Sequence, residues 1–494
     1  MKSSSPTTYS VIIAGGGPTG LMLAGELALA GVDVVIVEKR ASHALDGSRA
    51  KGIHARAIEV LDQRGIADRF ISEGQKYPFV GYAQMRLDIS DFPSRHNYLL
   101  GLNQSRFEPI LAKWVDELGV PTIRSCEVID FTQDDTGVTV DLSNGSSIRA
   151  EYLIGCDGGR SLVRRTAGID FPGLEPTTSW LIAEVEMKEM PVLGVRREGG
   201  GIGPVNAGQN EGPFGVTLKE EHLNSTQDTP TLRDLSEALM HAYGTDYGVH
   251  SPTWISRFTD TTRQAASYRK GRVVLAGDAA HIHPPQGGQG LGTGLQGAVN
   301  LGWKLAQVVK GVSPESLLDT YHAERHPVGA QVLRSAQAQI ALTTPDQRHD
   351  ALREITAELL SMDEPRRYIA GLMSGLNICY ELGEGHPLIG RRMPDLDVQG
   401  ADGSLRLFTL LHEAKPILLN FTDAESFDLT PWADRVRMYN LKYAGTWELP
   451  VLGVVASPPA VLVRPDGYVA WVGSVTDPQL PQMLTTWFGR PIAA

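Results

Sequence analysis

The sequence predicts an α/β protein with a parallel sheet near its start, and three observations support this fold class. Ser10–Ala14 and Val32–Val37 are apolar runs rich in β-branched residues, and they flank a stretch with the composition of a buried helix. Between about residues 176 and 265 the pattern changes to strand-like pieces around a glycine-rich stretch. Beyond about residue 385 a new alternation of strands and helices begins. Such changes indicate several sheet-based domains in one chain of 494 residues.

The individual elements follow in order from apolar periodicity and turn residues. The first strand leads into Gly15–Gly17, Pro18 stands where a helix begins, and Gly31 ends that helix. Further helices are expected at 54–65, 108–118, 232–243, 294–309 and 351–376. Further strands are expected at 127–131, 138–142, 147–150, 152–154, 272–276 and 416–421, and as a hairpin at 460–464 and 468–472. Asn144-Gly145 and Asp466-Gly467 mark tight turns between strands.

The composition excludes several classes of protein. Hydrophobic residues make up 42% and charged residues 21%, which is ordinary for a globular chain, so the chain as a whole is not intrinsically disordered. A net charge of −12 argues against non-specific binding to nucleic acid or to an anionic membrane. Cys126, Cys156 and Cys379 are too few and too scattered for a disulfide framework, a redox pair or a zinc site. The polar N-terminus and the lack of a long apolar run predict neither signal peptide nor membrane span, so we expect a cytoplasmic protein without a metal.

A glycine fingerprint follows the first strand. Gly15-x-Gly17-x-x-Gly20 opens the first helix, and Glu38 ends the second strand 18 residues after Gly20. In dinucleotide-binding folds such glycines allow a tight turn and a close approach of the backbone to a pyrophosphate, which lies at the helix N-terminus. A carboxylate at the end of the second strand accepts hydrogen bonds from ribose and repels a 2′-phosphate. This Rossmann-like motif alone therefore disfavours NADP and leaves both NAD and FAD open.

Two later motifs carry a family resemblance. Cys156-Asp157-Gly158-Gly159-Arg160-Ser161 and Gly277-Asp278-Ala279-Ala280-His281 each follow an apolar strand. With the first fingerprint they resemble the FAD-dependent aromatic hydroxylases, the class A flavoprotein monooxygenases with a p-hydroxybenzoate hydroxylase-like fold. The match extends through 48–56, Gln104, 284–291, 300–305 and 321–325, and so covers the whole chain. It is strongest to actinomycete enzymes that oxidise aromatic polyketides and related antibiotics, such as the angucycline and tetracycline hydroxylases and rifampicin monooxygenase.

The resemblance implies a division of the chain into domains. Residues 1–175 and 266–385 would form the two parts of a Rossmann-like FAD-binding domain, the second part ending in helices. Residues 176–265 would be an inserted, sheet-based substrate domain, in which Trp180, Phe214, Trp254 and Phe258 are candidates for the pocket. Residues 386–494 would be a thioredoxin-like domain that has lost its redox cysteines, since no cysteine follows Cys379.

The resemblance also implies which residues hold the cofactor. Gly15, Gly17, Thr19 and Gly20 would hold the pyrophosphate, and Glu38 the adenosine ribose. Asp157 would touch FAD and NADPH, and Asp278 the ribityl or pyrophosphate part. Three side chains, those of Lys39, Arg49 and Gln104, would line the cofactor, and Val128 would meet the adenine through its backbone. The segment containing Pro285, Gly288, Gly290, Leu291 and Gly292 would pass beside the isoalloxazine ring.

The activity implied by the resemblance is hydroxylation of a polycyclic aromatic, polyketide-type substrate by O₂ through a C4a-hydroperoxyflavin. FAD would be the resident cofactor and NADPH, rather than NADH, a transient co-substrate, in a monomer or homodimer active in secondary metabolism. No catalytic base is singled out. The family usually has Asn where Gly292 stands and Asp where Gly297 stands. These departures keep alternatives open: Baeyer–Villiger oxidation, inactivation of an antibiotic, or a flavin- or polyketide-binding protein that has lost oxygenase activity.

Overall fold

A computed structural model of the chain describes residues 7–45, 47, 50–196, 200–205, 212–226, 228–423 and 427–492. Its largest sheet has eight strands, with the order β19-β20-β11-β1-β2-β8 and with β9 and β10 attached to β11. The strands β1 (Thr7–Ala14), β2 (Val34–Glu38), β8 (Thr122–Arg124), β11 (Ser147–Gly155) and β20 (Val273–Leu275) run parallel. The predicted parallel sheet is confirmed.

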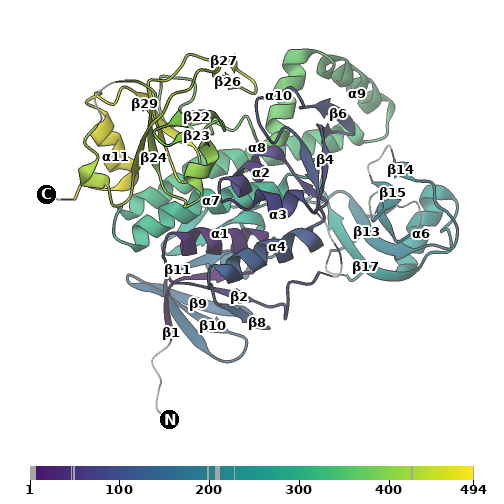
Figure 1. Cartoon of the computed structure of the whole chain (residues 1–494). Helices are drawn as coiled ribbons and strands as arrows, with labels where there is room; N and C mark the ends of the chain where they lie inside the picture. Colours follow the sequence, from purple (N-terminus) through teal and green to yellow (C-terminus); the bar gives the residue numbers. More distant parts are fainter. Residues whose placement is uncertain are drawn as a thin grey trace, which may run out of the picture.

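Helices cover the large sheet. Figure 1 shows α1 (Pro18–Leu29), α4 (Gln104–Glu117) and α7 (Gly290–Val309) lying together on one face of it. The hairpin β9 (Val128–Asp134) and β10 (Gly137–Leu142) extends the sheet in antiparallel fashion. Two predicted strands, 147–150 and 152–154, are in fact the single strand β11, because Glu151 continues the extended backbone without a turn. Tight packing explains the apolar helix α1, whose residues from Gly20 to Leu27 are all buried.

A second sheet of five antiparallel strands follows, in the order β14-β15-β16-β13-β17. Its members are β13 (Ser179–Glu186), β14 (Gly194–Val195), β15 (Gly201–Pro204), β16 (Phe214–Lys219) and β17 (His250–Thr259). One face packs against α6 (Leu232–Tyr243) through alternate apolar residues of β13 and β16. The other face carries the aromatic residues Trp180 and Phe258 and turns toward the large sheet.

Three helices follow α7 in the chain and lead to the C-terminal region. They are α8 (Asp319–Thr343), α9 (Gln347–Leu360) and α10 (Asp363–Ser374). The single helix expected at 351–376 is wrong, because the helix breaks at Ser361-Met362. Pro365 explains the break, since a proline is tolerated in the first turn of a new helix but not in the interior of a continuous one. Likewise α7 begins at Gly290, four residues before its expected start.

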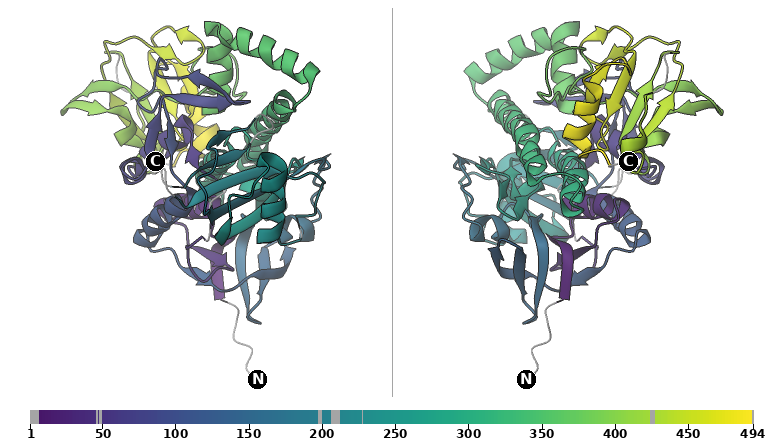
Figure 2. Two further views of the ribbon diagram at one scale, coloured as in Figure 1. Left: turned by 90° about the vertical axis from the view of Figure 1, so that its right-hand side faces the viewer. Right: turned by 90° about the vertical axis from the view of Figure 1, so that its left-hand side faces the viewer.

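The C-terminal region has its own sheet of four strands in the order β25-β24-β28-β29. β24 (Ile417–Asn420) is parallel to β25 (Arg437–Asn440), and β28 (Ala460–Val463) and β29 (Val469–Gly473) form the predicted hairpin. The helix α11 (Leu480–Phe488) packs on β29. Figure 2 shows this sheet, with α9 and α10, at the end of the molecule opposite to the hairpin of β9 and β10. The remaining elements are α2 (Ala55–Asp62), α3 (Ala67–Ile71), α5 (Leu162–Thr166), β3 (Gly52–Ile53), β4 (Gln75–Tyr77), β5 (Phe79–Tyr82), β6 (Met85–Asp88), β7 (Leu99–Gly101), β12 (Gly173–Leu174), β18 (Thr262–Gln264), β19 (Arg269–Lys270), β21 (His281–Ile282), β22 (Asp397–Gly400), β23 (Gly403–Arg406), β26 (Glu448–Leu449) and β27 (Gly453–Val454), with short 3₁₀ helices at Gly277–Ala279, Glu315–Leu318, Leu407–Leu411 and Thr430–Trp432.

Buried ion pairs join the C-terminal sheet to the rest. Arg464, after β28, donates two hydrogen bonds to Glu324 of α8, at 2.8 and 2.7 Å. Lys304 of α7 lies 2.9 Å from the same carboxylate, and Asn300 donates to Asp466 at 3.1 Å. Burial alone would raise the pKa of Glu324, but the charges of Arg464 and Lys304 outweigh it and lower the pKa to about 2. The C-terminal hairpin is thus fixed on helices α7 and α8 by charge.

None of the helices in the described part of the chain is both long and apolar enough to cross a bilayer.

Candidate flavin and substrate site

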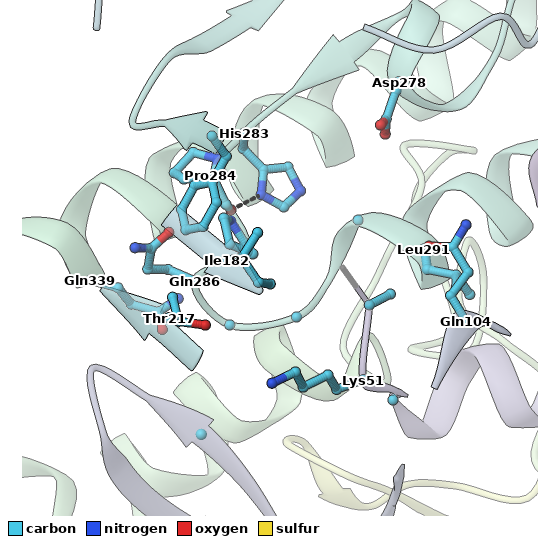
Figure 3. A pocket seen from close by; sticks show the side chains of 18 of the residues that line it. Lys51, Gln104, Ile182, Thr217, Asp278, His283, Pro284, Gln286, Leu291 and Gln339 are labelled. Atoms are coloured by element: carbon cyan, nitrogen blue, oxygen red, sulfur yellow. Dashed lines mark hydrogen bonds between the residues drawn. The ribbon is translucent and has the colours of Figure 1, made fainter. Parts of the chain in front are cut away.

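A cavity of about 830 Å³ lies between the carboxyl ends of the parallel strands, the loop that precedes α7 and the inner face of the second sheet. Figure 3 shows Gln104, Asp278 and Leu291 on one side of it, and Ile182, Thr217, Gln286 and Gln339 on the other. Ligands of parallel α/β sheets bind at this edge. One continuous space therefore connects the glycine fingerprint with the second sheet.

The glycine turn is built as the fingerprint requires. Gly15 has a φ of +104°, and a Cβ there would lie 2.4 Å from the carbonyl oxygen of Cys156. A Cβ on Gly20 would lie 2.0 Å from the carbonyl oxygen of Gly15. Gly17 is different, since a Cβ there would meet no atom within 4 Å, and its side opens into the cavity. In the described part of the chain no side chain caps the N-terminus of α1, so its free N–H groups form a site for an anion.

Thr19 is the point at which the separate motifs meet. A Cβ on Gly277 would lie 2.6 Å from the hydroxyl oxygen of Thr19. A Cβ on Gly294 of α7 would lie even closer to the same hydroxyl oxygen. Gly15 in turn touches Cys156, which opens the second motif. The structure therefore brings all three motifs into one cradle around the start of α1.

Glu38 holds the turn from the end of β2. Its Oε2 accepts a hydrogen bond from the backbone N–H of Gly16 at 2.6 Å, and Oε1 accepts two from Arg40, at 2.8 and 3.0 Å. Burial raises the pKa of Glu38, but the hydrogen bonds from Arg40 and Gly16 and the charge of Arg40 lower it further than burial raises it. Arg40 also pairs with Glu108, which accepts from Gln104 at 3.3 Å. No local pattern predicts the roles of Arg40 and Glu108, because their positions depend on pairing between distant segments.

The loop before α7 forms the wall opposite. Gly287 and Gly288 have φ values of +81° and +64°, which favour glycine. The ring Nε2 of His54 lies 2.8 Å from the carbonyl oxygen of Gly287, so the neutral ring donates this hydrogen bond. Burial lowers the pKa of His54 against the opposing effect of that bond. His54 thus fixes a loop that lies more than 200 residues away, a role that sequence reasoning missed.

The sequence-predicted cofactor residues fall into three sets. Gly17, Thr19, Gln104, Asp278, Pro285, Gly288, Gly290 and Leu291 line the cavity. Gly15, Gly20, Glu38, Lys39, Val128 and Asp157 do not line it, and Gly292 lines a neighbouring cavity of about 360 Å³ between α7, α8 and α10. Arg49 lies outside the described residues.

The residues behind the cavity differ in their surroundings. Glu38 supports the turn, whereas Lys39 is exposed and lies 3.9 Å from Glu127. One oxygen of Asp157 accepts a hydrogen bond from Val163 at the start of α5, and the other is buried without a hydrogen-bond partner. Val128 is buried at the start of β9, where it pairs with Leu142 at the end of β10.

Comparison with known proteins decides the family. Residues 8–336 match the family described as FAD binding domain, and residues 386–491 match the one described as aromatic-ring hydroxylase, C-terminal. The chain belongs to the FAD-binding aromatic-ring hydroxylases. It is 43% identical to a rifampicin monooxygenase of Streptomyces venezuelae, over 98% of this chain and 100% of the relative. It is 41% identical to a 12-dehydrotetracycline 5-monooxygenase/anhydrotetracycline 6-monooxygenase of Streptomyces rimosus, over 98% and 99%.

The fold agrees with that membership. The solved structure of OxyS, an anhydrotetracycline hydroxylase from Streptomyces rimosus, superposes with a TM-score of 0.90 at 40% identity, covering 98% of this chain and 100% of the other. This hydroxylase is therefore an FAD-dependent monooxygenase. Its site fits the cofactor, since Gly17 leaves the cradle open and α1 offers uncapped N–H groups to a pyrophosphate.

The far half of the cavity is aromatic and polar. Trp180 and Phe258 are stacked, with ring centroids 5.5 Å apart and planes 5° apart. Both line the cavity of the hydroxylase, with Ile182, Thr217 and Lys51 close by. Phe214 was a wrong candidate, because its side chain lies on the opposite face of the sheet, against α6. Trp254 packs beside the stacked pair and is not among the lining residues.

Proposed function

We propose that this hydroxylase inserts one oxygen atom of O₂ into an electron-rich, polycyclic aromatic substrate of the polyketide type. The observation that carries the proposal is the single cavity that joins the glycine turn of α1 to the stacked pair Trp180 and Phe258. Flat fused rings stack on aromatic faces, and the parallel indole and phenyl rings of Trp180 and Phe258 offer such faces to the cavity. Two relatives are named for rifampicin and for 12-dehydrotetracycline and anhydrotetracycline, and these names support the same substrate class.

The proposed roles of the chain's own residues follow from their places. The N–H groups of α1 and the open backbone at Gly17 bind the pyrophosphate, and Glu38 and Gln104 orient the adenosine end. The backbone from Pro285 to Leu291 lies against the isoalloxazine ring, while Asp278 faces the middle of the cofactor. Bound FAD supplies hydride acceptance from NADPH and activation of O₂. The second sheet closes the cavity and excludes water from the reacting atoms.

The remaining parts of the proposal concern assembly. Residues 176–265 form the substrate domain between the two parts of the FAD-binding domain, 1–175 and 266–385. Residues 386–494 are thioredoxin-like, which the parallel pair β24 and β25, the following hairpin and the final helix α11 support. The three free thiols suit a reducing cytoplasm. We propose a monomer or homodimer.

The test measures the bound cofactor, substrate-stimulated turnover and incorporation of labelled oxygen. Purified protein should show flavin absorbance, and anhydrotetracycline or a related tetracyclic phenol should stimulate NADPH oxidation. The product should gain one ¹⁸O atom from labelled O₂. Phe258→Ala should raise KM for the aromatic substrate roughly tenfold through loss of the stacked pair, whereas Phe421→Ala in the C-terminal region should leave KM unchanged.

Other outcomes identify the alternatives. A product with an enlarged or opened ring would show a Baeyer–Villiger reaction, in place of hydroxylation. A flavin-loaded protein that binds the phenol and incorporates no ¹⁸O would be a binding protein, and the departures at Gly292 and Gly297 would then be its cause.

A further inference from the structure

One cation stands in the wall of the cavity. Lys51 precedes β3, and Figure 3 shows its side chain crossing the space with Nζ directed toward β16, the strand of Thr217. The backbone around it is fixed, since the carbonyl of Lys51 accepts from Leu102 at 3.1 Å and that of Ala50 accepts from Gln104 at 2.9 Å. The backbone at Lys51 is therefore held against the segment that leads into the predicted cofactor residue Gln104.

The charge of Lys51 has no close counterion among the residues that the structure describes. Among the described residues no carboxylate lies within 4.0 Å of its Nζ, and Glu184 of β13 is the one acid that acts on it electrostatically. Nζ comes within 3.4 Å of where a Cβ on Gly215 would stand, and Gly215 is the register partner of Glu184. Burial lowers the pKa of Lys51, and the charge of Glu184 opposes that shift. An ammonium group in this position gains from any anion that enters the cavity.

The lysine lies in line with the aromatic platform. Trp180, Ile182 and Glu184 alternate along β13 and so share the face that turns to the cavity. Trp180 and Glu184 are four residues apart, or roughly 13 Å along a strand. A fused-ring molecule stacked on Trp180 can therefore extend over Ile182 and place an oxygen near Nζ of Lys51.

We propose that Lys51 binds an ionised oxygen of the substrate, a phenolate or an enolate of the fused-ring system, and thereby selects acidic polycyclic aromatics over neutral ones. The inference rests on the proposed function, because it assigns a substrate feature to the same cavity. The contact is a charge-assisted hydrogen bond in a cavity partly closed to water, the setting in which such a bond contributes most. Lys51 is a specificity residue here, and no proton transfer is assigned to it.

The test uses two probes with one skeleton. 2-Hydroxy-1,4-naphthoquinone is an anion at neutral pH, and 2-methoxy-1,4-naphthoquinone is neutral. Dissociation constants are measured by titration into FAD-loaded protein without reductant. Wild type should bind the anion more tightly than the ether. Lys51→Met should raise the dissociation constant of the anion roughly 10- to 100-fold and leave that of the ether nearly unchanged. Lys51→Arg should retain most of the preference for the anion.

Two further variants separate recognition from packing. Lys188→Met removes an exposed lysine of the same domain, away from the cavity, and should leave both constants unchanged. Glu184→Gln removes the competing carboxylate, and should keep or tighten binding of the anion. Flavin content and the melting temperature of each variant are measured first.

Several results would overturn the assignment. They are equal weakening of both probes by Lys51→Met, loss of FAD from that variant, weaker anion binding in Glu184→Gln, or no preference for the anion in wild type. Failure of wild type to bind either probe would count equally against it. These results are distinct from failure of the proposed function, which would appear as missing ¹⁸O in the product even where the anion preference is intact.

Discussion

Arg325 of α8 lies beside Gly297 of α7. A Cβ on Gly297 would stand 3.9 Å from Nε of Arg325 and 3.7 Å from the hydroxyl of Tyr321. The guanidinium is 3% exposed and donates to the hydroxyl of Tyr380 and to the carbonyl of Thr293, both at 3.1 Å. Within the described part of the chain, none of the ion pairs includes Arg325. A buried positive charge is therefore held by neutral acceptors at the first turn of α7.

Gly297→Asp should stabilise the protein by giving Arg325 a carboxylate partner. Room for the side chain exists, since the nearest atoms lie at ordinary contact distance. Gly297→Ala is the matched control, and by helix propensity alone it should raise the free energy of unfolding by about 0.5–1 kcal/mol. We expect Gly297→Asp to exceed Gly297→Ala in denaturant unfolding. A lower stability for Gly297→Asp than for Gly297→Ala would show that neutral acceptors already satisfy Arg325.

The pair of Arg464 and Glu324 should govern attachment of the C-terminal sheet. Glu324→Gln leaves Lys304 and Arg464 buried with the carboxylate of Asp466 alone. Removing one partner of a buried pair costs about 3–5 kcal/mol, so we expect a loss of that size in chemical denaturation. Glu358→Gln, on the exposed side of α9, should change stability by less than about 0.5 kcal/mol. A small effect of Glu324→Gln would mean that Asp466 compensates.

The same carboxylate predicts a dependence on acid. In the folded protein the pKa of Glu324 is lowered to about 2 from its ordinary 4.5, so folding favours the ionised form. Its contribution to stability is then fully present above about pH 4.5 and is lost as the pH falls toward 2. Unfolding measured from pH 6 downward should show this loss in wild type. The slope should be smaller in Glu324→Gln, and identical slopes would assign the acid sensitivity to other groups.

How much of this could be predicted from the sequence depends on the kind of signal. The parallel sheet and the cradle of α1 could be predicted, because local glycines and apolar runs dictate them, as at Gly15 and Gly20. Arg56, part of a conspicuous motif, proves to be fully buried and donates to the carbonyl of Asp466 at 2.9 Å, 410 residues away. Such partners depend on tertiary packing and leave no local trace.

The limits at the site have a similar origin. The sequence pattern predicts the start of α7 four residues too late, because the glycines from Gly290 to Gly294 do not distinguish a loop from a helix. Lys51 and Gln339 line the cavity from segments with no periodic signal pointing there. The aromatic candidates lie on opposite faces of the second sheet, because alternate residues of a strand point to opposite sides. Trp180 faces the cavity, and Phe214 faces the other way.

His54 should act as a positioning residue for the flavin. His54→Phe removes the donor to the carbonyl of Gly287 and keeps a ring of similar size. Loss of one such hydrogen bond costs about 1 kcal/mol, so the dissociation constant of FAD should rise about fivefold. His54→Asn keeps a donor group and should recover part of the affinity. Fluorescence titration of the apoprotein with FAD measures both, and an unchanged constant in His54→Phe would show that the loop holds its shape alone.

Alanine substitutions at two glycines of the fingerprint should affect different properties, folding stability at Gly20 and FAD binding at Gly17. Gly20→Ala places a methyl group 2.0 Å from the carbonyl oxygen of Gly15, which is a backbone atom and cannot rotate away. The backbone must shift, so we expect the free energy of unfolding to fall by at least about 2 kcal/mol. Soluble yield and melting temperature of the apoprotein would report this loss.

Gly17→Ala should instead leave the stability of the apoprotein unchanged. Gly17 has a φ of −78°, which alanine adopts freely, and the new methyl group would meet no protein atom within 4 Å. Stability without cofactor should change by less than about 0.5 kcal/mol. The methyl group would, however, stand where the pyrophosphate approaches the backbone, so the dissociation constant of FAD should rise roughly tenfold or more. If Gly17→Ala binds FAD as tightly as wild type, the cofactor does not lie over this turn, and the cradle around Thr19 serves packing alone.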